Sequence, residues 1–376
     1  MKSKLSRRAL IRAAGSAGAA AWAMPAGSQA TMPGPRFEGK ETPKICLGLD
    51  AGGGGFGPGA TPEAAQAGAR RIKQLGVDYV LSGGGRIPWE EGQLKDMMDR
   101  LKANGLTLGN LMIAGFPNAI YNRPGRDEDI EKVIQSVKAA GKAGLPVVEY
   151  NWYAHRAMEG YFEETGRAGA GWTGFDYERM KDLPPLENEG AHTLDEMWAN
   201  ITYFLKAVIP EAAKAGVRMA LHPNDPPAPL SRGSQQIMAT IEGWKKLVDI
   251  VKSPSNGITF DCGVTKEMGG DPVEVCRYFS ARDCINHMHF RNVIVKKPYE
   301  RYTEVFIDEG ENNMFAVMKE LVKQKYPRLI YPEHPRAIDY DRERGPIRGY
   351  PGGGSYAAYA VNVGYTRAML QAALTS

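Results

Sequence analysis

Four short apolar or β-branched segments of this 376-residue chain each end in a side chain that can bind a divalent metal. The four residues are His222, Asp261, His289 and Glu333. Cys262 is an alternative to Asp261, because neighbouring side chains of a strand point to opposite sides. Two imidazoles with one or two carboxylates suit Mn²⁺ or Fe²⁺, with Zn²⁺ as a third option. Such a ligand set leaves positions open for substrate oxygens, so the sequence predicts a catalytic metal centre.

The segments that must position these residues alternate with helical stretches along the chain. Strands are expected at Ile45–Asp50, Tyr79–Gly83, Leu106–Ala114, Pro146–Trp152, Arg218–Asn224, Ile258–Gly263, Ile285–Val293 and Arg328–His334. Strict alternation predicts parallel strands with right-handed crossovers, and eight units favour an α/β fold of the closed (β/α)8 TIM-barrel type. In that fold the carboxyl ends of the strands converge on the active site. His287, two residues before His289, is expected to fill the barrel interior.

Local signals set several helix boundaries. Thr61 followed by Pro62 predicts one helix start. The capping box Thr193-Leu194-Asp195-Glu196 begins a long helix in which Pro210 is expected to produce a kink or a break. A long insertion after the fourth strand, 153–192, is expected to form a loop that serves as a lid, because structureless loops of this length are usually functional.

The first thirty residues have the features of a twin-arginine signal peptide. Arg7-Arg8 precedes a weakly apolar, alanine-rich stretch and a small-residue site that ends at Ala30. We therefore expect 1–30 to be a signal, 31–376 to be a single barrel domain, and the protein to be exported to a periplasmic or other extracytoplasmic location.

Composition excludes several classes of protein. The predicted signal holds five of the 47 basic residues and no acidic one, so 42 basic and 43 acidic residues remain. That near-neutral remainder has no basic patch for nucleic acid, and no later apolar run approaches the roughly 18 residues of a membrane span. The four cysteines lack the paired spacing of a zinc ribbon or a disulfide framework.

Several motifs resemble those of the mannonate dehydratase family, which are metal-dependent lyases with a xylose-isomerase-like barrel. The similar stretches are Tyr150–Trp152, Thr193–Glu196, Phe204–Pro227, Asn256–Phe260 and His289–Val293. The family has Cys-Thr-Gly after the sixth strand, where this chain has Asp261-Cys262-Gly263. An ungapped match puts Asp261 at the family's cysteine ligand, and Cys262 stays the alternative. An exported protein would be a divergent member, since the family usually acts in the cytosol.

The resemblance implies dehydration of a sugar acid, most directly D-mannonate to 2-keto-3-deoxy-D-gluconate, with Mn²⁺ or Fe²⁺ as cofactor. It implies that His334 and Tyr356 are the general base and the general acid, in either order. It also implies that Arg291 and Asn151 contact the substrate. The partner is then a small sugar acid, and a homo-oligomer is compatible with the sequence.

Two other functions stay open on the same barrel. One is a sugar isomerase or epimerase that uses the same metal. It is favoured because Glu333-His334 stands where the family has an Asp-His pair, and because the family's lid motif is not recognisable. The other is an exported carbohydrate-binding barrel without catalysis, against which the presence of His334 and Tyr356 argues.

Overall fold

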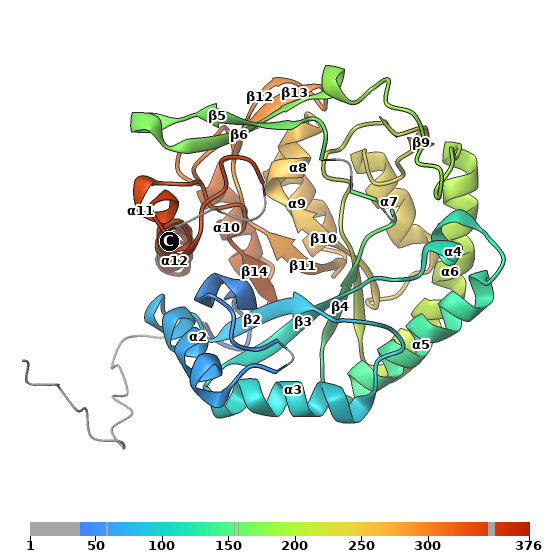
Figure 1. Ribbon diagram of the computed structural model, residues 1–376, viewed down its shortest axis with the longest axis horizontal. Helices are drawn as coiled ribbons and strands as arrows, with labels where there is room; N and C mark the ends of the chain where they lie inside the picture. Colours follow the sequence, from blue (N-terminus) through green and yellow to red (C-terminus); the bar gives the residue numbers. More distant parts are fainter. Residues whose placement is uncertain (1–37, 58, 154, 157, 345–349) are drawn as a thin grey trace, which may run out of the picture. The chain divides into compact units, whose positions relative to one another are not determined.

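The computed structural model describes residues 38–57, 59–153, 155–156, 158–344 and 350–376. Eight parallel strands close into a barrel in the order β1-β14-β11-β10-β7-β4-β3-β2. Their bounds are β1 Lys44–Gly48, β2 Tyr79–Gly83, β3 Thr107–Ile113, β4 Val147–Tyr150, β7 Arg218–Leu221, β10 Asn256–Asp261, β11 Ile285–His289 and β14 Leu329–Tyr331. Each strand overlaps its predicted range, so the expected (β/α)8 barrel is confirmed (Figure 1). Strands β10 and β11 are buried along their whole length, as is typical of parallel strands covered by helices.

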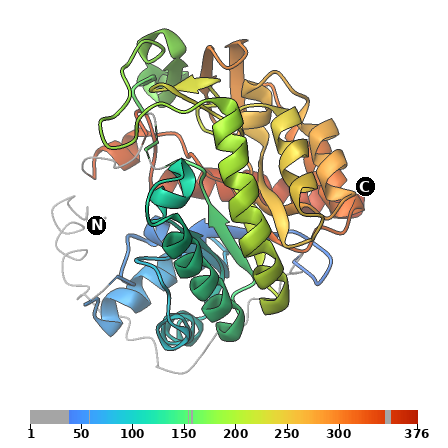
Figure 2. The same cartoon turned by 90° about the vertical axis from the view of Figure 1, so that its right-hand side faces the viewer.

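Helices surround the barrel. Those of ten residues or more are α2 Pro62–Gln74, α3 Glu91–Ala103, α5 Arg126–Ala143, α6 Leu194–Ala215, α7 Ile241–Ile250, α10 Met314–Lys323 and α12 Tyr356–Thr375. Shorter helices are α4 Pro117–Tyr121, α8 Cys262–Glu267, α9 Pro272–Ser280 and α11 Asp339–Arg342. Figure 2 shows α5 and α6, which contact each other, running side by side along the barrel.

The capping signals act where the sequence predicts. The Thr61 hydroxyl accepts from the backbone N–H of Ala64 and caps α2, with Pro62 in its first turn. Thr193 and Glu196 form the predicted capping box at the start of α6. The expected break at Pro210 is wrong, because α6 continues through Pro210 to Ala215. A proline in a helix loses one backbone hydrogen bond, and here the largely buried apolar face of α6 holds the helix on both sides of it.

The insertion after β4 is not the structureless lid that the sequence suggests. It forms β5 (Tyr161–Thr165) and β6 (Gly171–Asp176). These strands pair antiparallel with each other, and β6 pairs with β13 (Arg301–Glu304) of a hairpin whose other strand is β12 (Val293–Lys297). This four-stranded sheet lies at the top of Figure 1. Because β5 follows β4 and β12 follows β11, the sheet is attached at the carboxyl ends of two barrel strands.

The segment that follows β14 is bound to this sheet. The backbone N–H of Gly171 donates to the carbonyl of Ala337 (2.8 Å), and that of Ala337 donates to the carbonyl of Gly352 (3.0 Å). Arg336 donates to the Thr173 hydroxyl, which donates to the carbonyl of Pro351. The sheet therefore holds the residues that come after the last barrel strand. No helix in the described ranges is long and apolar enough to cross a membrane, and the predicted signal, 1–30, lies outside those ranges.

The capping box predicts a measurable contribution to stability. The Thr193→Ala substitution removes the acceptor of the Glu196 N–H (3.3 Å) and should lower the free energy of unfolding by about 1 kcal/mol. Urea denaturation measures this change. The control Thr193→Ser keeps the hydroxyl and should retain most of the stability; an equal loss in both variants would contradict the role of the cap.

Candidate active site

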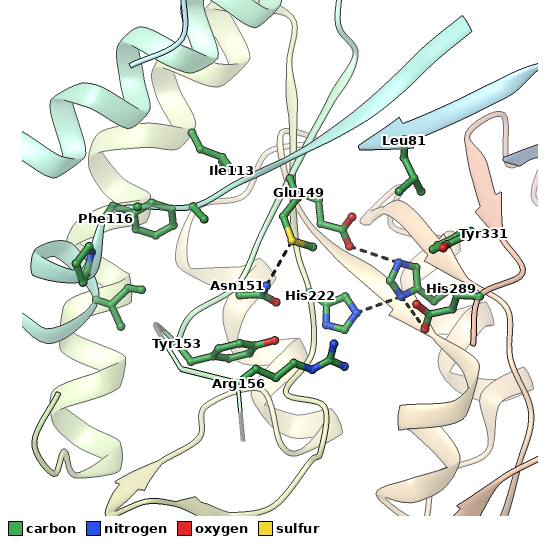
Figure 3. A pocket seen from close by; sticks show the side chains of 16 residues that line it. Leu81, Ile113, Phe116, Glu149, Asn151, Tyr153, Arg156, His222, His289 and Tyr331 are labelled. Atoms are coloured by element: carbon green, nitrogen blue, oxygen red, sulfur yellow. Dashed lines mark hydrogen bonds and ion pairs between the residues drawn. The ribbon is translucent and has the colours of Figure 1, made fainter. Parts of the chain in front are cut away.

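A cavity of about 610 Å³ lies at the carboxyl ends of the barrel strands. Its walls come from β2, β3 and β4, from the segment after β4, and from the ends of β7, β11 and β14. Figure 3 shows His222 and His289 on one side of this cavity and Ile113 and Phe116 on the other. The cavity is therefore where a TIM barrel places its active site.

Four predicted ligands converge at one end of the cavity. The Nε2 atom of His222 lies 3.1 Å from Nδ1 of His289. The same Nδ1 atom lies 3.0 Å from Oε1 of Glu333 and 3.8 Å from Oδ2 of Asp261. Barrel register explains part of this convergence, because Asp261 is paired directly with His289 across β10 and β11.

Hydrogen bonding prepares His222 to offer a lone pair. Its Nδ1–H donates to the backbone carbonyl of Pro223 (2.7 Å), which leaves Nε2 unprotonated and directed toward His289. Burial and the positive charge of His289 lower the pKa of His222 to about 3. The side chain is therefore a neutral imidazole, the form that binds metals.

Asp261, and not Cys262, faces this centre. Asp261 caps α8, with Oδ1 accepting from the N–H of Val264 (2.9 Å) and Oδ2 accepting from Nε of Arg291 (3.1 Å). Cys262 is the first residue of α8 and is packed in the main hydrophobic core. Burial and the neighbouring charge of Asp261 raise the pKa of the Cys262 thiol well above its usual value. A buried protonated thiol is a weak ligand, because the thiolate is the form that binds metals.

The donor set fits a divalent cation. The ligand atoms of His222, Asp261 and His289 all lie within 4.8 Å of one another, a spacing that suits atoms placed about 2.0–2.2 Å from one ion, and Glu333 approaches this group through Nδ1 of His289. Oε1 of Glu333 is buried, and the groups nearest to it are Nδ1 of His289 (3.0 Å) and Nε of Arg291 (3.3 Å). Burial and the charge of Glu333 raise the pKa of Asp261 to about 6, against the opposing effect of Arg291. A cation at this point would relieve the repulsion between the two carboxylates.

Glu149 on β4 lies beneath the ligands, and sequence analysis did not identify it. Its Oε1 atom lies 3.6 Å from Nε2 of His289 and accepts from the Thr259 hydroxyl (2.7 Å). Its other oxygen accepts from Nδ2 of Asn110 (2.8 Å). His287 lies beside Glu149, fully buried in the barrel interior as expected. An acidic residue inside the otherwise apolar, buried strand β4 is the sequence signal for Glu149.

A second polar cluster adjoins the ligands. Nδ1–H of His334 donates to Oε2 of Glu304 (2.8 Å), and Nε2 of His334 lies 3.6 Å from the ligand Glu333. The ring of Tyr350 packs against His334, with centroids 4.2 Å apart. Both Tyr350 (3.1 Å) and Tyr161 (2.6 Å) donate to the carboxylate of Asp225.

Tyr356 is not part of either group of residues. It begins α12, and its hydroxyl donates to the backbone carbonyl of Arg71 (3.0 Å). Neither Tyr356 nor His334 is among the residues that line the cavity, but His334 lies 3.6 Å from Glu333, which does line it. The tyrosine that the structure brings to His334 is Tyr350, which sequence analysis did not identify.

Arg291 does not line the cavity either. Its guanidinium is buried and lies within 4 Å of five carboxylates: Asp225, Asp261, Glu267, Glu304 and Glu333. The arginine that does line the cavity is Arg156, which also pairs with Asp225. Asn151 lines the cavity as expected of a substrate contact, and its Oδ1 atom is buried without a hydrogen-bond partner. Sequence analysis did not identify Arg156, because the chain around it has no recognisable motif. The position of Arg156 depends on the inserted strands β5 and β6.

Comparison with known proteins identifies the family. A model of the D-mannonate dehydratase (UxuA) family matches residues 153–374. A mannonate dehydratase of Streptococcus equi subsp. zooepidemicus is 32% identical over 288 residues, which cover 69% of this chain and 78% of the relative. One from Thermotoga petrophila is 28% identical over 330 residues, or 76% of this chain and 88% of the relative.

Solved structures agree in fold. A mannonate dehydratase from Streptococcus suis serotype 2 superimposes with a TM-score of 0.75 at 24% identity, covering 89% of this chain and 95% of the other. An L-ribulose 3-epimerase superimposes with a TM-score of 0.55 at 12% identity, covering 89% and 96%. Given the extent of the family match, this chain belongs to the D-mannonate dehydratase family and is a hydro-lyase of the class that dehydrates sugar acids.

Proposed function

We propose that this protein is a divalent-metal-dependent dehydratase that converts D-mannonate to 2-keto-3-deoxy-D-gluconate. The observation that carries the proposal is the convergence of four donor atoms, from His222, Asp261, His289 and Glu333, at the cavity end beside His334. The family relationship supplies the reaction class. The metal, the substrate and the role of each residue are the proposed parts.

The reaction needs a base at C2 and an acid at C3. The C2–H bond breaks, its electron pair forms the C2–C3 double bond, and the C3–O bond breaks as that hydroxyl leaves as water. The resulting enol becomes the 2-keto product. A divalent cation held by the four ligands would stabilise the negative charge that develops next to the substrate carboxylate, which otherwise makes this C–H bond weakly acidic.

His334 is suited to take the C2 proton. Glu304 accepts the Nδ1–H, so Nε2 is the nitrogen that is free to act as base. Despite its burial, the interactions of Glu304 with His334 and Arg291 lower the pKa of Glu304, so its carboxylate stays charged and can stabilise the imidazolium that forms when His334 takes the proton. His334 has a φ of 45°, in the left-handed region, three residues after the end of β14.

Tyr350 replaces Tyr356 as the proposed acid for the departing C3 hydroxyl. Its ring contacts His334, and the guanidinium of Arg156 lies 4.7 Å from the ring centroid. A phenol at this position lies beside His334, the proposed base, and beside the cationic Arg156. Two groups that transfer protons at adjacent carbons must lie close to each other.

Arg156 replaces Arg291 as the proposed partner of the substrate carboxylate. The Arg156 side chain lines the cavity and retains partial exposure, whereas Arg291 is enclosed by carboxylates. A planar guanidinium can bind a carboxylate with two parallel hydrogen bonds. Asn151, with its unpartnered Oδ1, is suited to accept a hydrogen bond from a substrate hydroxyl.

We also propose that residues 1–30 direct export by the twin-arginine route, which leaves 31–376 as the mature enzyme. The proposal rests on Arg7-Arg8 and the small-residue site at Ala30. This route transports folded proteins, which suits an enzyme that acquires its metal before export.

The activity itself is the first prediction. The purified protein with Mn²⁺ under anaerobic conditions should convert D-mannonate to the 2-keto-3-deoxy acid, and EDTA should abolish turnover until Mn²⁺ is restored. Product is measured as the 2-keto acid. A folded, metal-loaded protein that instead interconverts sugar isomers or epimers would contradict dehydration and support the isomerase alternative.

The second prediction distinguishes the two candidate ligands on the sixth barrel strand. The Asp261→Ala substitution should lower metal affinity by about 10-fold or more, because it removes a ligand. Cys262→Ala should leave metal affinity within about threefold and cost stability through a small cavity. Calorimetric titration with Mn²⁺ measures both; a larger loss in Cys262→Ala would show that the cysteine is the ligand.

The third prediction separates chemistry from metal binding. His334→Gln should retain the metal but reduce kcat by about 10²–10⁴-fold, the usual contribution of a general base. Metal content is measured by elemental analysis of the same sample. Loss of activity in proportion to loss of metal would mean that His334 serves the metal site and not proton transfer.

A further inference from the structure

The cavity has two chemically different halves. Its polar half holds His222, His289 and Glu333 together with Asn151, Tyr153 and Arg156. The other half is lined by the apolar side chains of Met112, Ile113, Phe116, Pro117 and Ile120, with the chain at Ala114 and Gly115 between them. In Figure 3, Ile113 and Phe116 lie across the cavity from His222 and His289. The cavity thus offers hydrogen bonds at one end and apolar surface at the other.

The apolar half is a fixed part of the core. The ring of Phe116 stacks on that of Phe204, with centroids 5.6 Å apart and planes 15° apart. Ile113, at the end of β3, is 1% exposed. Because both side chains are packed in this way, neither can move aside so that a polar side chain lines the cavity in its place. Met112 is the partly exposed member, and its Sδ atom lies 3.6 Å from Nδ2 of Asn151, at the border of the two halves.

We infer that the enzyme recognises C1 to C3 of its substrate and leaves the far end, C5 and C6, against the apolar half, so that its substrates include 6-deoxyhexonic acids as well as hexonic acids. This inference rests on the proposed function. When the substrate is bound at the proposed metal ligands and near His334, its reacting carbons lie at the polar end of the cavity. The volume of 610 Å³ lies within the range of pockets that enclose whole small molecules, so the rest of a six-carbon chain remains within the cavity.

The chemistry of the wall determines which substrates it rejects. A site built to hydrogen-bond a hydroxyl rejects the analogue without it by roughly 10⁴–10⁵-fold, because the site's own polar groups are left unpaired. The side chains of the apolar half have no such groups to leave unpaired. Replacing the C6 hydroxyl with hydrogen therefore costs no hydrogen bond to these side chains and adds a methyl group that they can bury.

Binding of two acids to the Mn²⁺-loaded protein tests the inference. Calorimetry with D-mannonate and with 6-deoxy-D-mannonate should give a Kd for the deoxy acid that is equal to, lower than, or at most threefold above the Kd for D-mannonate. A larger ratio would overturn the inference, as would failure of both acids to bind. Product formation from D-mannonate is measured separately: binding without product contradicts the proposed function, while the Kd ratio still decides the inference.

A pair of variants at Met112 tests whether C5 and C6 of the substrate lie against this apolar wall. Met112→Gln adds a hydrogen-bonding group of nearly the same length, which can also accept from Asn151, and Met112→Leu keeps the wall apolar. Met112→Gln should raise the ratio of the two Kd values (deoxy over D-mannonate) by threefold or more relative to Met112→Leu. The same ratio in both variants would contradict the placement of C5 and C6 beside Met112.

Discussion

Buried negative charge at the carboxyl end of the barrel is the constraint on which the site depends. Glu149, Asp225, Asp261, Glu267, Glu304 and Glu333 are all almost fully buried there. An isolated buried carboxylate is costly, so each must be paired, protonated or bound to a metal. Arg291 pairs with five of the six. The sequence predicts that Arg291 contacts the substrate, but these ion pairs give it a structural role instead.

Arg291 does not neutralise all of this charge. Burial raises the pKa of Glu267 well above its usual value despite its contact with Arg291, and it raises that of Asp261 as well. The negative charge that Arg291 does not neutralise lies nearest to His222 and His289, where Asp261 and Glu333 flank Nδ1 of His289. Against the effect of burial, His289 already holds the pKa of Glu333 well below its usual value, so a divalent cation at this point would chiefly stabilise Asp261 in its charged form. The same electrostatic requirement that shapes the interior thus supports this point as the proposed place of the chemistry.

The barrel and the four converging residues could be predicted from the sequence, since parallel strands must end at one rim and the candidate ligands stand where the strands end. Asp261, for example, ends β10 next to His289 at the end of β11, and both follow from strand positions alone. Residues on the inserted segments could not be placed in this way. Arg156 and Tyr350 reach the site because β5 and β6 pair with the β12–β13 hairpin and hold the chain after β14. That pairing joins segments more than a hundred residues apart, and a local pattern does not encode it.

A crystal structure of the Mn²⁺-loaded protein, with the anomalous signal of manganese recorded, tests the central claim most directly. The account predicts one ion bound by Nε2 of His222, Nδ1 of His289, and carboxylate oxygens of Asp261 and Glu333. Manganese bound instead among Asp225, Glu304 and His334, the neighbouring group of potential ligands, would contradict it. In that case His334 would be a ligand, and the base would have to be sought elsewhere.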